Sequence, residues 1–322
     1  MAAQLTIALD ANGADAGPAE VARGAGLAAR QGVRVLLFGP ADAITPAEGV
    51  EVVDAPVSIA KAADPARAVR STPEASIVQA VQAVAGGRAD ALVSGGSTGA
   101  ALAAGLFHIK RARGIHRPAL AALVPVPGRP FLLLDCGANV AVRPEHLVQF
   151  AHMGAAFMEA VMGISGPRVA LLANGTEPTK GTDDVVAAHA ALAAAPGLRF
   201  TGNVFLKVME GTAAALLAAV RDAAQSSPRA KAGGLLLRPA LRGLRQEIDP
   251  EAQGGAFLLG LRGLGVVPHG SFGAEGIARA IALAARGVRA DVVGATYARL
   301  AAAGALRRPP APSAATATVP DP

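Results

Sequence analysis

The chain has 322 residues, enough for one large or two ordinary domains, and 52% of them are hydrophobic, which allows a substantial core. A formal net charge of +6 is explained either by compositional bias or by an acidic partner or an anionic membrane surface, while 3% aromatic residues and no recognised binding motif argue against nucleic acid. The single cysteine, Cys136, excludes an internal disulfide framework and is typical of a reducing compartment; neither a transmembrane run nor a signal peptide is expected.

Four short apolar strands, each followed by a small polar loop with glycine, are expected in the first 181 residues. These strand–loop units occupy residues 5–18, 91–100, 131–140 and 169–181. Each strand has the continuous apolar character of a strand buried on both faces, as in a parallel sheet flanked by helices. Because loops at the carboxyl ends of such strands collect ligands and glycine lets backbone N–H groups approach them, we expect four loops on one sheet edge around an anion.

The alternation of strands with helices continues along the chain and indicates an α/β fold. Further strands are expected at 33–38 and 50–53, strand-and-loop structure at 254–271, and helices at 20–30, 76–85, 145–162, 205–224 and about 275–286. Leucines alternate with arginines within residues 226–251, which suits either a packed helix pair or a projecting helical hairpin for dimerisation or membrane contact. The Pro/Ala-rich tail, residues 304–322, is expected to be disordered.

Nine short motifs together resemble one known family. In chain order they read ALDANGADAGP, VSGGSTGA, RPAL, LLLDCGANV, PEHLVQFAHMG, GTEPTKG, TGNVFLKVMEG, GGAFLLGL and HGS. In this order they are similar to the bacterial phosphate acyltransferases, the acyl-acyl carrier protein:phosphate transacylases of phospholipid synthesis. The resemblance implies a three-layer α/β/α sandwich with a mostly parallel sheet, like isopropylmalate dehydrogenases and phosphotransacetylases. It implies a single domain over residues 1–303, with the projecting helical hairpin at about 205–252.

The resemblance also implies an activity. A fatty acyl group passes from acyl carrier protein to inorganic phosphate, and the acyl phosphate feeds a glycerol-3-phosphate acyltransferase. The family works as a cytoplasmic homodimer peripherally associated with the membrane, and no metal or organic cofactor is expected. Because acyl carrier protein is acidic, a basic docking face agrees with the net charge.

The loops supply the candidate site residues. Lys180 is the expected charged contact to phosphate, and His269 is the expected proton donor to the departing thiolate, because histidine titrates near neutral pH. The substrate and phosphate cradle is expected to comprise Asp10, Asn12, Gly13, Ser94, Gly96, Ser97, Thr98, Asp135, Asn139 and Asn203.

Each candidate also has a purely structural interpretation. Asp10 and Asp135 can cap helices or hold loops, Ser97 can cap a helix, and Asn139 can stabilise a turn. Lys180 can form a surface ion pair with Glu177. His146 and His152 are interpreted as packing or interface residues. Cys136 is interpreted as structural, since a nucleophilic thiol needs an activating histidine nearby.

The sequence departs from the family pattern in four places. The opening loop reads Ala11-Asn12-Gly13-Ala14-Asp15 where the family has Ala-Met-Gly-Gly-Asp, and Ser97 replaces an asparagine. The family's lysines after Arg70 are replaced by Thr72 and Pro73. Most seriously, residues 197–200 run directly into 201–204, so a loop and a buried strand of the family are missing after Phe200. Either the sheet is rearranged, or a neighbouring segment fills the gap, or this copy is impaired.

Three other functions stay open. One is a short-chain acyl-CoA phosphotransacetylase, distinguishable by its acyl donor. Another is a non-catalytic member that binds carrier protein or membrane, which the missing strand favours. A dehydrogenase is disfavoured because no G-x-G-x-x-G fingerprint follows a strand.

Overall fold

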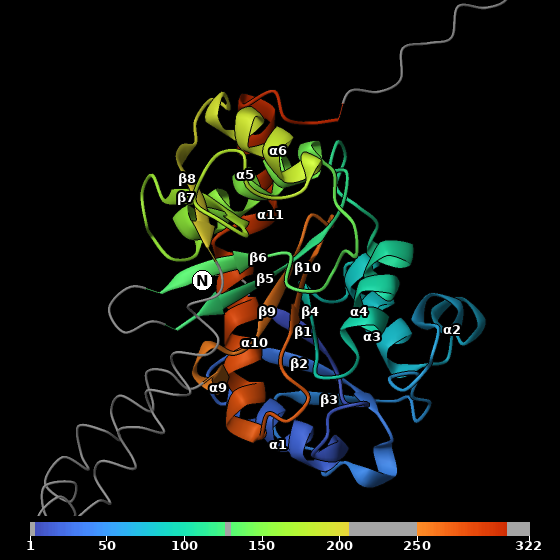
Figure 1. Ribbon diagram of the computed structural model, residues 1–322. Helices are drawn as coiled ribbons and strands as arrows, with labels where there is room; N and C mark the ends of the chain where they lie inside the picture. Colours follow the sequence, from blue (N-terminus) through green and yellow to red (C-terminus); the bar gives the residue numbers. More distant parts are fainter. Residues whose placement is uncertain (1–3, 126–129, 206–249, 308–322) are drawn as a thin grey trace, which may run out of the picture.

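The computed structural model describes residues 4–125, 130–205 and 250–307, and its main element is an eight-stranded sheet (Figure 1). The strands lie in the order β3-β2-β1-β4-β10-β9-β5-β6. Their bounds in that order are Val50–Asp54, Arg34–Gly39, Thr6–Asp10, Ala91–Ser94, Leu264–Val267, Ala256–Leu259, Ala119–Val124 and Phe131–Leu134. The strands β3, β2, β1, β4 and β10 are mutually parallel, so most of the sheet has the predicted arrangement.

The far side of the sheet is antiparallel, which corrects one expectation. β9 is antiparallel to both β10 and β5, and β6 is antiparallel to β5. β5 therefore runs in the same direction as β4, while β6 runs against it. The loop after β6 consequently opens at the opposite edge from the loops after β1 and β4. The prediction that all four glycine loops share one edge is wrong for this loop.

Helices cover both faces of the sheet and complete three layers (Figure 1). α1 (Gly17–Ala29) and α10 (Ala274–Arg289) pack on one face, and α3 (Ser76–Ala85) and α4 (Thr98–Ala104) on the other. Successive residues of β1 alternate between the two cores: Ile7 and Leu9 join the first, and Ala8 joins the second. The strands are apolar throughout because both of their faces are buried.

The core is built mainly from small and aliphatic side chains, with few aromatic residues. Gly24 of α1 lies so close to α10 that a Cβ there would be 2.7 Å from the Ala274 carbonyl oxygen. Close helix contacts of this kind let an Ala-, Val- and Leu-rich sequence reach a dense interior. One aromatic pair contributes: the rings of Phe157 and Phe257 meet edge to face, with centroids 4.8 Å apart.

A second sheet of two parallel strands, β7 (Arg168–Ala173) and β8 (Arg199–Phe205), lies apart from the large sheet (Figure 1). It packs with α5 (Pro144–Ala160) and α6 (Asp183–Ala193), and α11 (Val292–Ala302) packs on α5. The fourth predicted strand therefore exists, but it is outside the large sheet, so its loop also fails to share the expected edge.

The segment shortened after Phe200 is itself a strand. Residues 199–205 form β8 and pair with β7, so this segment is a strand and not the bare connection that the sequence suggested. Leu172 and Val204 are register partners, and they are 41% and 44% exposed. Apolar side chains of the small sheet are thus exposed in the described structure.

The remaining elements largely follow the sequence. The helices predicted at 20–30, 76–85, 145–162 and 275–286 are α1, α3, α5 and α10, while β5 and α11 were not predicted. Short helical elements complete the described chain: α2 (Pro65–Ser71), α9 (Pro250–Gln253), η1 (Ala41–Ala43) and the π-helical η2 (Gly105–Ile109).

Two sequence predictions concern segments largely outside the described residues. The predicted hairpin falls mainly on residues 206–249, and most of the tail on 308–322; both lie outside. Residues 304–307 belong to the fold rather than to a tail: Arg307 donates its N–H to the Gly114 carbonyl, and the Ala305 carbonyl accepts from Gln149. Within the described ranges, none of the helices has both the length and the apolar character needed to cross a membrane.

Candidate active site

The polar pocket of the described structure lies where the strand order changes direction. From β1 the chain continues to β2 on one side, while β4 lies on the other, so the loops after β1 and β4 diverge. Open α/β sheets bind ligands in the crevice at such a switch point. The pocket there is lined by Asp10, Asn12, Ser58, Ile59, Ala60, Ser76, Ile77, Ser94, Ser97 and Ala100.

Asp10 is the centre of the hydrogen-bond network in this pocket. Its Oδ1 accepts from the Ser76 hydroxyl at 2.6 Å, and its Oδ2 accepts from the Ser94 hydroxyl at 2.8 Å. The Asn12 N–H also donates to Oδ1 at 3.2 Å. The Asn12 side-chain amide donates to Ser76 Oγ and to the Ala55 carbonyl, both at 3.0 Å. Three elements and one loop are thereby fixed around a single carboxyl group.

Burial governs the protonation of this carboxyl group. Asp10 is 3% exposed, and desolvation raises its pKa to about 6, although the hydrogen bonds from Ser76, Ser94 and Asn12 oppose that rise. A carboxyl group that titrates near neutral pH in a polar pocket is typical of a functional position. Both interpretations of Asp10, loop fixation and ligand contact, are compatible with this geometry.

Two glycines let the loops of the site approach each other. Gly13 has φ +95°, and a Cβ there would lie 2.5 Å from Ala60 Cβ and 3.0 Å from Gly96 Cα. A Cβ on Gly96 would in turn lie 3.0 Å from the Asn12 carbonyl oxygen. Backbone of the two loops is thus in direct contact, which requires residues without side chains.

The second loop leads directly into a helix. Ser97 is the N-cap of α4, and its hydroxyl accepts from the Ala100 N–H at 3.3 Å. Thr98 is the first residue of that helix. The Gly96 N–H points to Ser94 Oγ at 3.4 Å. The capping interpretation of Ser97 is therefore confirmed, and Ser97 also lines the pocket.

His269 lies on a third loop at this edge, directly after β10. The loop is joined to the first one because the Asp15 N–H donates to the Gly270 carbonyl at 2.8 Å. The Asp15 carboxylate lies over Gly270, where a Cβ would be 3.2 Å from Oδ2. The His269 ring is exposed, and its Nδ1 lies 2.8 Å from the Ser271 hydroxyl. The third loop thus adds an exposed imidazole to the edge that holds the pocket.

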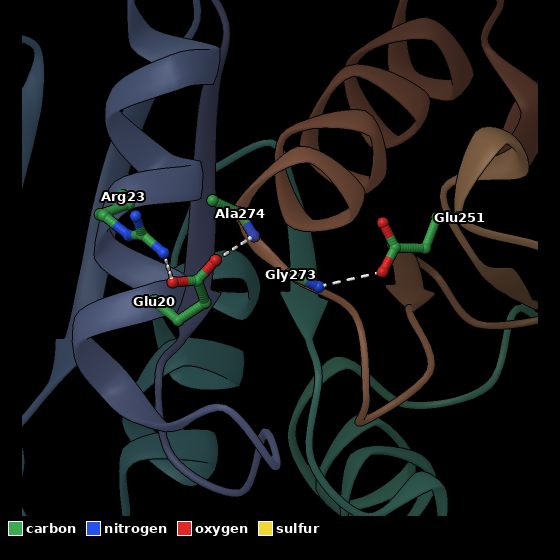
Figure 2. A network of polar contacts seen from close by, with 5 residues as sticks. All are labelled: Glu20, Arg23, Glu251, Gly273 and Ala274. Carbon is green, nitrogen blue, oxygen red and sulfur yellow. Dashed lines mark hydrogen bonds and ion pairs between the residues drawn. The ribbon is translucent and has the colours of Figure 1, made fainter.

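The helix that follows this third loop already has anionic partners at its N-terminus. Figure 2 shows the Ala274 N–H donating to Glu20 Oε1 at 2.7 Å and the Gly273 N–H donating to Glu251 Oε1 at 3.1 Å. Glu20 also pairs with Arg23. These carboxylates satisfy N–H groups of α10 and occupy its positive end. The N-terminus of α10 is therefore already occupied by carboxylates of the chain itself.

Asp135 and Asn139 lie elsewhere, beside the amino end of β5. The Asn139 amide donates to Asp135 Oδ1 at 2.8 Å and to the Pro118 carbonyl at 2.9 Å. Burial raises the pKa of Asp135, and the hydrogen bond from Asn139 opposes the rise. The neighbouring Cys136 thiol points to the Leu120 carbonyl at 3.3 Å, and burial raises its pKa, as expected of a structural cysteine. Asp135 and Asn139 thus stabilise the turn after β6, at the opposite edge of the sheet from Asp10.

Lys180 and Asn203 belong to the small sheet. The Asn203 amide donates to the Glu177 carbonyl at 2.8 Å, and its oxygen lies 2.9 Å from His189 Nδ1. Lys180 is exposed, and its backbone N–H also donates to the Glu177 carbonyl. Asn203 therefore fixes the loop that carries Lys180. The structure does not bring these two residues into the pocket lined by Asp10.

Sequence reasoning missed Ser76 and Ser58. Ser76 was expected only as the first residue of a helix, yet its hydroxyl bridges Asp10 and Asn12. The N-cap of α3 is Ala75, and Ser76 is the first residue of the helix. The Ser76 hydroxyl therefore does not serve as the N-cap of α3, and a serine in that position was the signal that could have identified it. His146 and His152 are buried on α5, in agreement with their interpretation as packing residues.

Fold and pocket together define an α/β/α protein with a small polar site at the strand ends. Solved structures share this fold. A branched-chain phosphotransacylase from Enterococcus faecalis V583 is 19% identical, with a TM-score of 0.54 over 88% of this chain and 99% of that one. A phosphotransacetylase from Streptococcus pyogenes is 17% identical, with a TM-score of 0.56 over 92% and 94%. At these identities the likeness establishes the fold.

The chain belongs to the fatty acid synthesis protein family, whose model matches residues 5–202 and 195–294. The two matches overlap at the shortened segment. Among curated relatives, the phosphate acyltransferase of Heliobacterium modesticaldum is 41% identical, over 90% of this chain and 96% of that protein. The phosphate acyltransferase of Geobacillus thermodenitrificans is 39% identical, over 92% and 99%. The resemblance found in the sequence motifs is confirmed.

Proposed function

We propose that this chain transfers an acyl group from a thioester to inorganic phosphate, yielding an acyl phosphate and a free thiol. The family and the relatives named phosphate acyltransferase support the reaction class. The observation that carries the proposal is that Asp10, Asn12 and Ser94 meet in one pocket at the switch point of the sheet, in a member of this family. Phosphate held there would be oriented by fixed groups.

In the proposed reaction, a phosphate oxygen attacks the thioester carbonyl carbon. The new C–O bond replaces the C–S bond, and the thiolate leaves with a proton. His269 is the proposed donor of that proton, through Nε2, since its Nδ1 lies beside Ser271. Lys180 is the proposed cationic contact, presented by the loop that Asn203 holds. Thr98, Gly13, Gly96 and Ser97 complete the proposed cradle, and Asp135 with Asn139 supports the opposite edge.

We further propose acyl carrier protein as the acyl donor, with a homodimeric, peripherally membrane-associated enzyme in the cytoplasm that supplies a glycerol-3-phosphate acyltransferase. The net charge of +6 supports an acidic carrier and an anionic membrane surface. A single catalytic domain over residues 1–303 is part of the same proposal.

The test is thiol release from palmitoyl-acyl carrier protein, followed as a function of phosphate concentration. Release that rises with phosphate and yields acyl phosphate supports the proposal. Parallel assays with palmitoyl- and acetyl-coenzyme A separate a carrier-protein enzyme from a phosphotransacetylase. No release with any donor, from a chain with a cooperative thermal transition, would contradict an enzymatic role.

A further inference from the structure

We propose that Asp10 makes the pocket selective for an oxyanion that carries a hydrogen, so that phosphate is accepted and sulfate rejected. This inference rests on the proposed function, because it takes the β1–β4 pocket as the phosphate site. It adds a specificity-determining contact: the Asp10 carboxylate accepts a hydrogen bond from the bound anion itself.

The hydrogen bonds around Asp10 leave one acceptor position for such a contact. Each carboxylate oxygen has two lone pairs. Among the described residues, Oδ1 receives two donors, the Ser76 hydroxyl and the Asn12 N–H. Oδ2 receives one, the Ser94 hydroxyl. Asp10 lines the pocket, and the second lone pair of Oδ2 is the acceptor position of this carboxylate for which the described residues supply no donor.

The neighbouring serines do not offer hydrogen-bond donors to a fully ionised anion. A hydroxyl group has one hydrogen, and those of Ser76 and Ser94 both point to Asp10. What these side chains offer a ligand is oxygen lone pairs. The inner wall of the pocket is therefore rich in acceptors.

An anion without a hydrogen meets repulsion at this wall. Sulfate near pH 8 carries two charges and no hydrogen, so its oxygens would face the acceptors of a carboxylate. Monohydrogen phosphate has the same charge but can turn its O–H toward Oδ2. Asp10 is 3% exposed, so water and salt screen the repulsion poorly. The groups that contact Asp10 from β4, α3 and its own loop are Ser94, Ser76 and Asn12, none of them charged.

The experiment measures anion binding without any acyl donor, as the rise in Tm of the full chain at constant ionic strength and pH 8. Phosphate, arsenate and sulfate are the probes. Arsenate also carries a hydrogen, so we expect arsenate and phosphate to act at similar concentrations. Sulfate should need at least tenfold more for the same shift. Sulfate acting within threefold of arsenate would overturn the inference.

Two variants locate the selectivity. Asp10→Asn supplies an amide N–H in place of a lone pair, so the ratio of sulfate to phosphate affinity should rise at least tenfold. Ser94→Ala keeps the carboxylate, so the ratio of sulfate to phosphate affinity should stay within threefold of wild type. An unchanged ratio in Asp10→Asn contradicts the assignment. If Asp10→Asn does not fold, the wild-type comparison decides alone.

Failure of this inference is distinguishable from failure of the proposed function. A chain that discriminates the anions but releases no thiol retains the selective site and loses the acyl transfer. A chain that turns over but binds sulfate as well as arsenate retains the function and loses the selectivity.

Discussion

Ser94 and Asp10 are direct register partners on β4 and β1, and the Ser94 hydroxyl donates to Asp10 Oδ2 at 2.8 Å. The two residues are 84 positions apart in the sequence, yet each is the last residue of its strand. The contact therefore depends on the parallel pairing of β1 and β4. A register shift of one residue would turn one of these side chains to the opposite face of the sheet and destroy the pocket.

Removal of the Ser76 hydroxyl should lower both the stability of the chain and its apparent affinity for phosphate, whereas removal of a nearby exposed serine hydroxyl should change neither. Ser76→Ala removes the 2.6 Å hydrogen bond to Asp10 and leaves a buried acceptor less satisfied. We expect a loss of stability of about 1–2 kcal/mol and a rise of roughly tenfold in the half-saturating phosphate concentration. Ser71→Ala, on the exposed end of α2, is the matched control and should change neither quantity. Equal effects of the two variants would argue against a special role for Ser76.

Gly13→Ala tests the close approach of the two loops. Its Cβ would clash with Ala60 and crowd Gly96, in addition to adopting a positive φ. Gly17 is the control, because it also has positive φ, +80°, but a Cβ added there would meet no heavy atom within 4 Å. We expect Gly17→Ala to cost about 1 kcal/mol and Gly13→Ala at least twice as much, with loss of phosphate binding. Urea unfolding measures the difference; similar costs would exclude a contact effect.

His152 and Gln149 are two polar residues of α5 for which replacement by leucine should change the free energy of unfolding in opposite directions. Both are 1% exposed on α5. Gln149 makes three hydrogen bonds, to His116, Gly114 and Ala305, whereas both ring nitrogens of His152 are without partners in the described structure. Gln149→Leu should lower the free energy of unfolding by about 2–3 kcal/mol, and His152→Leu should raise it by about 1 kcal/mol. Destabilisation by His152→Leu would show that the ring has partners in solution.

The same histidine predicts a pH dependence of stability. Burial lowers the pKa of His152 to about 4, with the nearby Arg299 acting in the same direction, against 6.5 for an unperturbed ring. Between these values the unfolded chain binds a proton that the folded chain excludes, so the folded state loses stability as the pH falls from 6.5 to 4. His152→Leu should reduce this loss in chemical unfolding measured across that range. An identical pH profile in the variant would contradict the assignment.

Lys180 stays a candidate contact whose role a substitution can test. Lys180→Gln should raise the phosphate concentration for half-maximal thiol release by tenfold or more, because the proposed contact pairs this charge with the anion during the reaction, although Lys180 lies outside the pocket lined by Asp10. Lys110→Gln is the control, as an exposed lysine of the large-sheet region. Initial rates over a range of phosphate concentrations provide the measurement. Equal phosphate dependence in wild type and Lys180→Gln would remove Lys180 from the site.

Part of this site was predictable from the sequence. Asp10, Asn12 and Ser94 were identified because strand ends and glycine loops are local features, and the five parallel strands follow from the same apolar runs. β5 was missed because an Ala-rich run does not distinguish a strand from a helix. The direction of β6 was not predictable, since an edge strand's orientation is set by its connection through β5 and not by its own residues.

Tertiary contacts explain the other misses. Ser76 was missed because its hydroxyl acquires its partner from residue 10, which lies 66 positions away. The β7–β8 sheet could not be predicted from the sequence, because residues 199–205 suit either a connection or a strand until they pair with β7. The family motifs gave the reaction class more reliably than they gave the place of each side chain.

The most direct test compares the phosphate dependence of acyl phosphate formation in wild type and in the Ser76→Ala/Ser94→Ala double variant. Palmitoyl-acyl carrier protein is kept saturating, and the acyl phosphate is trapped with hydroxylamine. We predict product from the wild type, and at least a tenfold higher half-saturating phosphate concentration in the double variant with an unchanged KM for the acyl donor. The same half-saturating phosphate concentration in both proteins would contradict the placement of phosphate at the β1–β4 pocket.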